Sequence, residues 1–194
     1  MFDGLFTPAF LQSACAHRGE PAQNVIRLYI GDDLGEMYKV IADLSYTGTV
    51  SAEYTAGGVT HTQTITGDSF TCDPDAHTVV TITGNVTRLS VGAPPNGIIT
   101  GIDADDCKSL MSLVTSPLIE TLKISKYLTS LDIRGNSITT VYYPANNNAV
   151  STEIADAITN AATNNGTVHT REEAKYYATI ETAADDKGWT IEEL

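Results

Sequence analysis

The sequence predicts a mostly β fold that ends in a small α/β unit. The first observation is a short pattern, apolar-x-x-apolar-x-apolar or small, which recurs six times between Val86 and Tyr143. The second is an alternating polar and apolar block before these repeats, and the third is a change to helical spacing after them. A single short strand and its turn cannot bury their apolar side chains alone, so we expect the copies of the pattern to stack into a short solenoid.

The repeats follow one another at intervals of roughly ten residues, and each has a central apolar position. We expect these positions to point into one shared core. They are Leu89, Ile102, Leu113, Leu122, Leu131 and Val141. Stacked repeats expose extended surfaces, which favours binding over catalysis as the function.

One copy of the repeat, from Leu128 to Ile138, matches the frame L-x-x-L-x-L-x-x-N-x-L at every position. The stretch resembles the BspA-like leucine-rich repeats of bacterial surface proteins and of bacteriophage virion proteins. This resemblance implies a leucine-rich-repeat solenoid in which two half-units make one coil. The alternative is an ordinary antiparallel sheet with a strand in every repeat.

The chain is expected to contain four segments. Residues 1–44 hold an N-terminal docking segment and the first strands, 45–85 form a β-hairpin capping region, 86–148 form the solenoid, and 149–194 form an α/β C-terminal cap. The antiparallel β region before the solenoid would cover its open end, where core and strand edges are otherwise exposed.

Strand signals dominate the first half of the chain. Val25–Ile30 reads as a strand, and residues 34–44 fit either a short helix or a strand. Gly57-Gly58 is expected to turn a hairpin. Further strands are expected over 70–72 and 78–83.

Helical spacing dominates the last segment. Ser151 is predicted to cap a first helix, and Thr170 with Glu173 is predicted to form a capping box for a second helix. A strand over 167–169 is expected to lie beside a final strand that includes Trp189, the single tryptophan and the expected packing anchor.

Charge and hydropathy narrow the classes of partner and location. The net charge is −13, from 24 acidic and 11 basic residues, and no Lys/Arg cluster is present, which argues against a nucleic-acid partner. No apolar run approaches the ~20 residues that a spanning helix needs, so membrane insertion is not expected. The N-terminus lacks the features of a signal peptide, which favours a virion, or host cytoplasm during assembly, over the alternative of the cell surface.

The sequence contains no recognisable catalytic, cofactor-binding or metal-binding set. The four histidines lack the spacing of metal ligands, and Cys107 is expected to be a small buried residue in a turn. The densest carboxylate cluster is Asp103, Asp105 and Asp106, which reads either as a solvated turn or as a divalent-cation site.

Two sets of residues are candidates for contacting a partner. The first set crowds aromatic and aliphatic side chains near the N-terminus and consists of Phe2, Leu5, Phe6 and Phe10. The second set is Lys123, Arg134 and Tyr142 on the repeats, with Tyr143 expected to point inward because strand neighbours face opposite sides.

The expected function is therefore that of a non-enzymatic structural or interaction protein. The resemblance favours a phage virion component, such as a tail or capsid appendage, whose partner is a protein: either other virion subunits or a second copy of the chain. A bacterial cell-surface adhesin-like module is the alternative. A β-solenoid glycan hydrolase is the enzymatic rival, but it needs a dicarboxylate pair that the sequence does not nominate.

Overall fold

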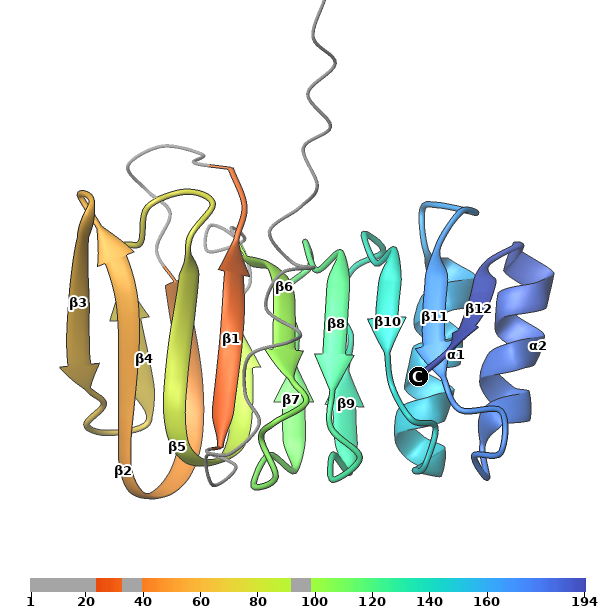
Figure 1. Ribbon diagram of the computed structural model, residues 1–194, viewed down its shortest axis with the longest axis horizontal. Coiled ribbons are helices and arrows are strands. Elements are labelled where there is room, and N and C mark those ends of the chain that lie inside the picture. Colours follow the sequence, from red (N-terminus) through yellow and green to blue (C-terminus); the bar gives the residue numbers. More distant parts are fainter. Residues whose placement is uncertain (1–23, 33–39, 92–98) are drawn as a thin grey trace, which may run out of the picture.

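The computed structural model describes residues 24–32, 40–91 and 99–194 and shows a mostly β protein with two helices near the C-terminus (Figure 1). The elements are β1 (Val25–Ile30), β2 (Val40–Ala56), β3 (Val59–Thr64), β4 (Ser69–Cys72), β5 (Val79–Val91), β6 (Ile99–Ala104), β7 (Ser112–Val114), β8 (Thr121–Ile124), β9 (Ser130–Asp132), β10 (Thr140–Tyr142), α1 (Asn148–Asn160), β11 (Thr167–Thr170), α2 (Tyr177–Lys187) and β12 (Thr190–Glu193).

The strands belong to one mixed sheet whose order is β12-β11-β10-β8-β6-β1-β5-β2-β3. Pairing is antiparallel from β3 to β6 and parallel from β6 to β12. A further parallel row, β5-β7-β9, lies behind the first in Figure 1. We call the row β6-β8-β10-β11-β12, together with β1, the front row, and β5-β7-β9 the back row.

The repeats alternate between these two rows. Ile102, Leu122 and Val141 are register partners in the front row. The central residues of the intervening copies, Leu89, Leu113 and Leu131, are register partners in the back row. After β10 and β11 the chain returns through α1 and α2 instead of strands, and β12 pairs with β11. The strand–helix–strand arrangement predicted for the C-terminal segment is thus confirmed.

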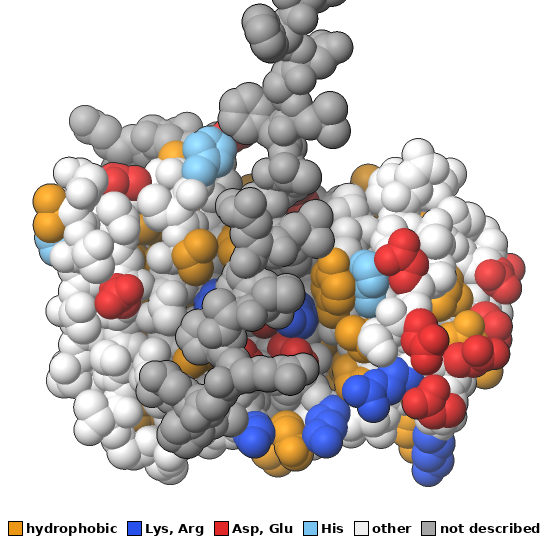
Figure 2. Space-filling view, in the orientation of Figure 1, with side chains coloured by type: hydrophobic (Ala, Val, Ile, Leu, Met, Phe, Trp, Pro, Cys, Tyr) orange, Lys and Arg blue, Asp and Glu red, His pale blue; other side chains and the backbone are white. Residues whose placement is uncertain are grey.

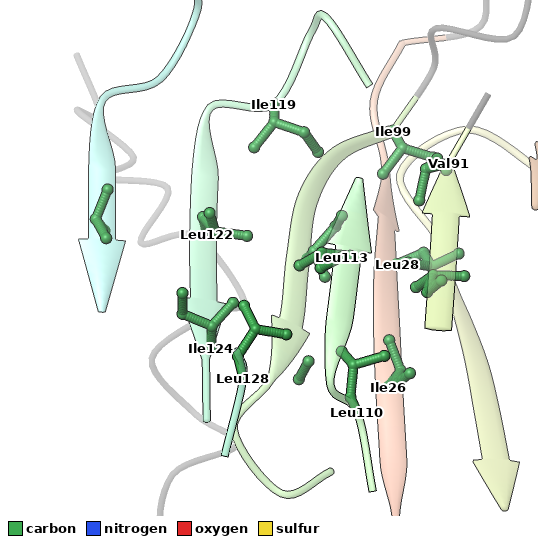
Figure 3. Close-up of a cluster of buried hydrophobic side chains, with 14 of the residues drawn as sticks. Ile26, Leu28, Val91, Ile99, Leu110, Leu113, Ile119, Leu122, Ile124 and Leu128 are labelled. Carbon is green, nitrogen blue, oxygen red and sulfur yellow. The ribbon is translucent and has the colours of Figure 1, made fainter. Parts of the chain in front are cut away.

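The core lies between the two rows. Figure 3 shows Leu122 and Ile124 of β8, Leu113 of β7 and Leu28 of β1 among the side chains that fill this space. Of the six central repeat residues, five are at most 1% exposed, whereas Leu131 is partly buried. Leu131 differs because β9 is the last strand of the back row, so its outer side faces α1 instead of another strand.

The long strands β2 and β5 connect the two rows. The first half of β5 pairs with β1, and its second half pairs with β7. The change of direction falls at Gly84, which has φ +135°; a Cβ there would lie 2.7 Å from the carbonyl oxygen of Thr49. Only glycine satisfies both the positive φ and this close approach.

The strand predictions for the first half agree with the structure where it describes the chain. Gly57 and Gly58 turn the β2–β3 hairpin as expected. The helical alternative for residues 34–44 is wrong over 40–44, which are the start of β2; residues 33–39 lie outside the described part.

Both predicted helix caps are wrong. The N-cap of α1 is Asn147, whose side-chain oxygen accepts a hydrogen bond from Val150 N, and Ser151 lies buried inside the helix. Asparagine caps as well as serine, so the earlier candidate begins the helix. Thr170 ends β11 and is 1% exposed, and α2 begins only at Tyr177, without a side-chain cap. The backbone of Thr170 is used instead for β pairing with β12 and by Leu194 N.

Trp189 is the packing anchor that the sequence predicts. Its indole is 5% exposed and donates a hydrogen bond to the carbonyl of Thr163 at 3.1 Å. A Cβ at Gly166 would lie 2.2 Å from the indole ring, so the glycine makes room for it. The contact joins the loop before β11 to the start of β12 and closes the C-terminal end.

Candidate binding face

Successive strands of the front row place one outward side chain each in a single line. We call this line the charged row. It runs through register partners and consists of Arg27, Asp103, Lys123, Tyr142, His169 and Glu192. Neighbouring strands are ~4.8 Å apart, so adjacent members of the row are within contact distance.

The left part of the charged row in Figure 1 is held by ion pairs. Arg27 lies 3.7 Å from Asp103 and 3.8 Å from Asp106, and Lys123 lies 3.5 Å from Asp105. The side chains of Arg27 and Lys123 are 29% and 31% exposed, so these pairs lie at the surface and contribute modestly to stability. Their main effect is to hold the two cations in place.

These ion pairs also indicate whether the carboxylate cluster of Asp103, Asp105 and Asp106 could bind a divalent cation. Each of its three carboxylates faces Arg27 or Lys123, so the cationic side chains occupy the position that a divalent ion would take. Within the described ranges, no group of three or more His, Cys, Asp or Glu side chains is placed to hold a metal ion. The geometry favours the turn over the cation site.

The right part of the charged row is aromatic. The rings of Tyr142 and His169 stack at 4.0 Å between centroids, with planes 1° apart. Nδ1 of His169 lies 3.3 Å from Oε2 of Glu192. Burial lowers the pKa of His169 below its ordinary 6.5, and the nearby Glu192 carboxylate opposes that change in part. Burial thus favours the neutral form of His169, which lies between the Tyr142 ring and the Glu192 carboxylate.

A second line of outward side chains runs beside the first. We call it the threonine row, and it consists of Thr121, Thr140, Thr167 and Thr190. On β6 its place is taken by Gly101, where a Cβ would lie 3.2 Å from Cδ2 of Tyr29, so the tyrosine ring lies over the glycine. The two rows together form a candidate binding face of hydroxyl, aromatic and charged groups. Figure 2 shows charged side chains of both signs over the C-terminal strands.

The structure brings together two of the three repeat residues nominated as contacts. Lys123 and Tyr142 are register partners in the charged row, and Tyr143 is fully buried, as the alternation of strand neighbours predicts. Arg134 follows β9 in the back row and forms an ion pair with Asp132 at 3.4 Å. The N-terminal candidates Phe2, Leu5, Phe6 and Phe10 lie outside the described residues.

Sequence reasoning missed Arg27, His169 and Glu192 as members of this face. A signal for the last two was available, because His169 follows the buried Val168 and Glu192 follows the partly buried Ile191, much as Lys123 follows Leu122. Val168-His169 and Ile191-Glu192 continue the repeat pattern into the C-terminal segment. No local signal marks Arg27, because β1 reaches the front row by pairing with distant strands.

The described cysteines are buried, and the described histidines outside the charged row each contact one neighbouring side chain. Cys72 and Cys107 are both buried, and burial raises the pKa of the Cys72 thiol to about 12. His61 stacks on Tyr54 at 5.4 Å, and His77 lies 3.3 Å from Asp32. Both histidines are exposed.

Comparison with protein-family models, with curated proteins and with solved structures finds no match to this chain. The leucine-rich-repeat resemblance therefore stays a prediction from the residues. As for membranes, neither described helix has the length and apolar character needed to cross one.

Proposed function

We propose that this chain is a non-enzymatic binding module in which residues 86–148 form a short leucine-rich-repeat solenoid. The observation that carries this proposal is the alternation of the repeats between two parallel rows, with the outward residues of one row in register. The binding face is the surface of the front row, made of the charged row and the threonine row.

A protein partner fits this face best. The face mixes fixed cations, carboxylates, stacked rings and hydroxyls over several strands, which is the composition of a protein–protein contact. The ion pairs and the Tyr142–His169 stack hold these side chains before binding, so little conformational entropy is lost when a partner docks.

The location of the partner follows from the resemblance. BspA-like repeats occur in virion proteins, and we propose a tail or capsid appendage that meets other virion subunits. A cell-surface adhesin-like role is the second candidate, supported by the same repeats. The hydrolase reading is weaker, because Asp103, Asp105 and Asp106 are each engaged by a cationic side chain.

Affinity capture with a tagged chain tests the binding face. The variant Lys123→Glu/Tyr142→Ala reverses one charge and removes one ring in the charged row, and Arg134→Glu is the matched charge reversal on the back row. We expect wild type and control to retain the same captured protein, and the front variant to lose it with an unchanged melting temperature. Retention by the front variant, or loss by the control alone, would contradict the assignment of the face.

A further inference from the structure

The strand β3 is an edge of the sheet and is exposed throughout. It pairs only with β2 among the described strands, and all six of its residues are exposed. An edge strand presents unpaired backbone donors and acceptors along its free side, which is a template for pairing with another strand.

Each of the other edge strands in the described part has a feature that hinders pairing with another strand, and β3 has no such feature. β12 carries Glu192 and Glu193. β4 has four residues and is flanked by Asp68 and Asp73. β9 is covered by α1, where Oε1 of Glu153 accepts a hydrogen bond from Ile133 N.

The sequence of β3, V-T-H-T-Q-T, contains no Lys, Arg, Asp, Glu or Pro. Charged residues, proline and shortness are the usual means of blocking an edge. Val59, at its start, is 59% exposed, more than any other large hydrophobic residue in the described part. In Figure 2 the region around β2 and β3 is mostly white, in contrast to the mixed charges over the C-terminal strands.

The hairpin that presents β3 is held firmly. The Asp75 carboxylate accepts hydrogen bonds from Gly57 N and Gly58 N, both at 2.8 Å, and Asp75 N donates to the carbonyl of Thr55 at 2.8 Å. His61 stacks on Tyr54, which in turn contacts Phe70 of β4 edge-on. The free edge is therefore rigid and already extended, so pairing costs little further ordering.

We propose that β3 is a self-association edge, and that two copies of this chain pair antiparallel through β3 about a two-fold axis at Thr62. Register partners would then be Thr62 with Thr62, and Thr60 with Thr64 of the second copy, which places threonine opposite threonine. The alternating threonines of β3 match those of a second copy in this register, and charge does not oppose pairing at this edge. Each copy carries −13 and repels another almost everywhere, but the uncharged β3 brings no like charges face to face. Pairing through β12 would oppose Glu192 and Glu193.

Salt dependence follows from the same argument. The attraction consists of backbone hydrogen bonds and threonine contacts, and the opposing force is long-range repulsion between acidic copies. Salt screens that repulsion within about 10 Å at 0.1 M, so the dimer dissociation constant should fall as salt rises.

Sedimentation equilibrium of the full chain over a range of concentration and NaCl tests the proposal. We expect a monomer–dimer equilibrium that tightens with salt. Thr62→Lys should weaken it at least tenfold, because two ammonium groups meet at the axis. Thr182→Lys on α2, outside the binding face, changes the net charge equally and should leave the dimer intact. Both variants are checked for an unchanged melting temperature.

A cysteine variant keeps the test valid if Thr62→Lys fails to fold. In a Cys15→Ser background, Thr62→Cys should form an intermolecular disulfide on oxidation, and Thr182→Cys should not. A chain that stays monomeric at every salt concentration overturns the proposal. So does a dimer indifferent to Thr62→Lys, a cross-link found only through residue 182, or open-ended growth of oligomers.

Discussion

At the scale of single residues, the most informative positions are those that follow a buried or partly buried strand residue. Lys123, Tyr142, His169 and Glu192 hold this place on successive front strands, and each contacts another charged or aromatic side chain. Each front strand therefore contributes to the face the side chain that points outward next to an inward-pointing residue.

Burial of the central repeat residues predicts different costs for the same substitution. Leu122 is fully buried between the rows, so Leu122→Ala should lower the free energy of unfolding by about 2–5 kcal/mol. Leu131→Ala should cost less than half as much, because that side chain is only partly buried. Urea unfolding of the two variants measures both values, and equal costs would contradict the placement of β9 at the margin.

His169 predicts a pH dependence of stability. Its pKa is lowered in the folded state, mainly by burial, so the unfolded chain binds the proton more tightly. Its contribution is present above pH 6.5 and is lost as pH falls through the folded pKa. His169→Gln should therefore flatten the decline of melting temperature below pH 6.5 relative to wild type. A profile unchanged by the substitution would show that the imidazole is not buried against Tyr142.

At the scale of elements, sequence periodicity located most strands and both helices, but not the helix starts. Ser151 and Thr170 are good caps in isolation, yet Asn147 and the β pairing of Thr170 determine where the helices begin. The residue at which a helix starts depends on which of several suitable capping residues lies in the turn after the preceding strand. The position of β1 between β5 and β6 could not be predicted from the sequence either, because it depends on pairing between segments that are distant in the chain.

Asn24, the first described residue, is tied by hydrogen bonds to later parts of the chain. Its side-chain oxygen accepts hydrogen bonds from Lys108 N at 2.9 Å and Ser109 N at 3.3 Å, and its Nδ2 donates to Asn85 Oδ1. A truncation that tests the N-terminal docking hypothesis must therefore retain it. Removing residues 1–23 should preserve the circular dichroism spectrum and abolish partner or particle incorporation. Normal incorporation of the truncated chain would exclude the docking role.

Asp75 predicts a local effect on the hairpin. Asp75→Ala removes two charge-assisted hydrogen bonds to the β2–β3 turn, so hydrogen exchange at Gly57 and Gly58 should accelerate at least tenfold. Exchange in β8 should stay unchanged and serves as the internal control. If the turn exchanged at the wild-type rate, Asp75 would not be what holds the edge strand.

At the scale of the whole molecule, the repeats explain why one chain forms both a core and a face. Copies alternate between two rows, so each row receives every second copy, and helices replace the back strands near the C-terminus. Sequence reasoning predicted the repeats, the hairpin region and the C-terminal unit, each of which rests on local pattern. It did not predict that β2 and β5 would bend from one row to the other, because that depends on the close approach at Gly84.

The central claim is that outward residues of every second repeat meet on one face. The most direct test is oxidation of paired cysteine variants in a Cys15→Ser background. Thr140 and Thr167 are register partners on β10 and β11, so Thr140→Cys/Thr167→Cys should form an intramolecular disulfide in the folded monomer. Thr140→Cys/Ser130→Cys, which pairs the front row with the back row, should not. Equal cross-linking of both pairs, or of the second pair alone, would contradict the alternation of rows and the binding face built on it.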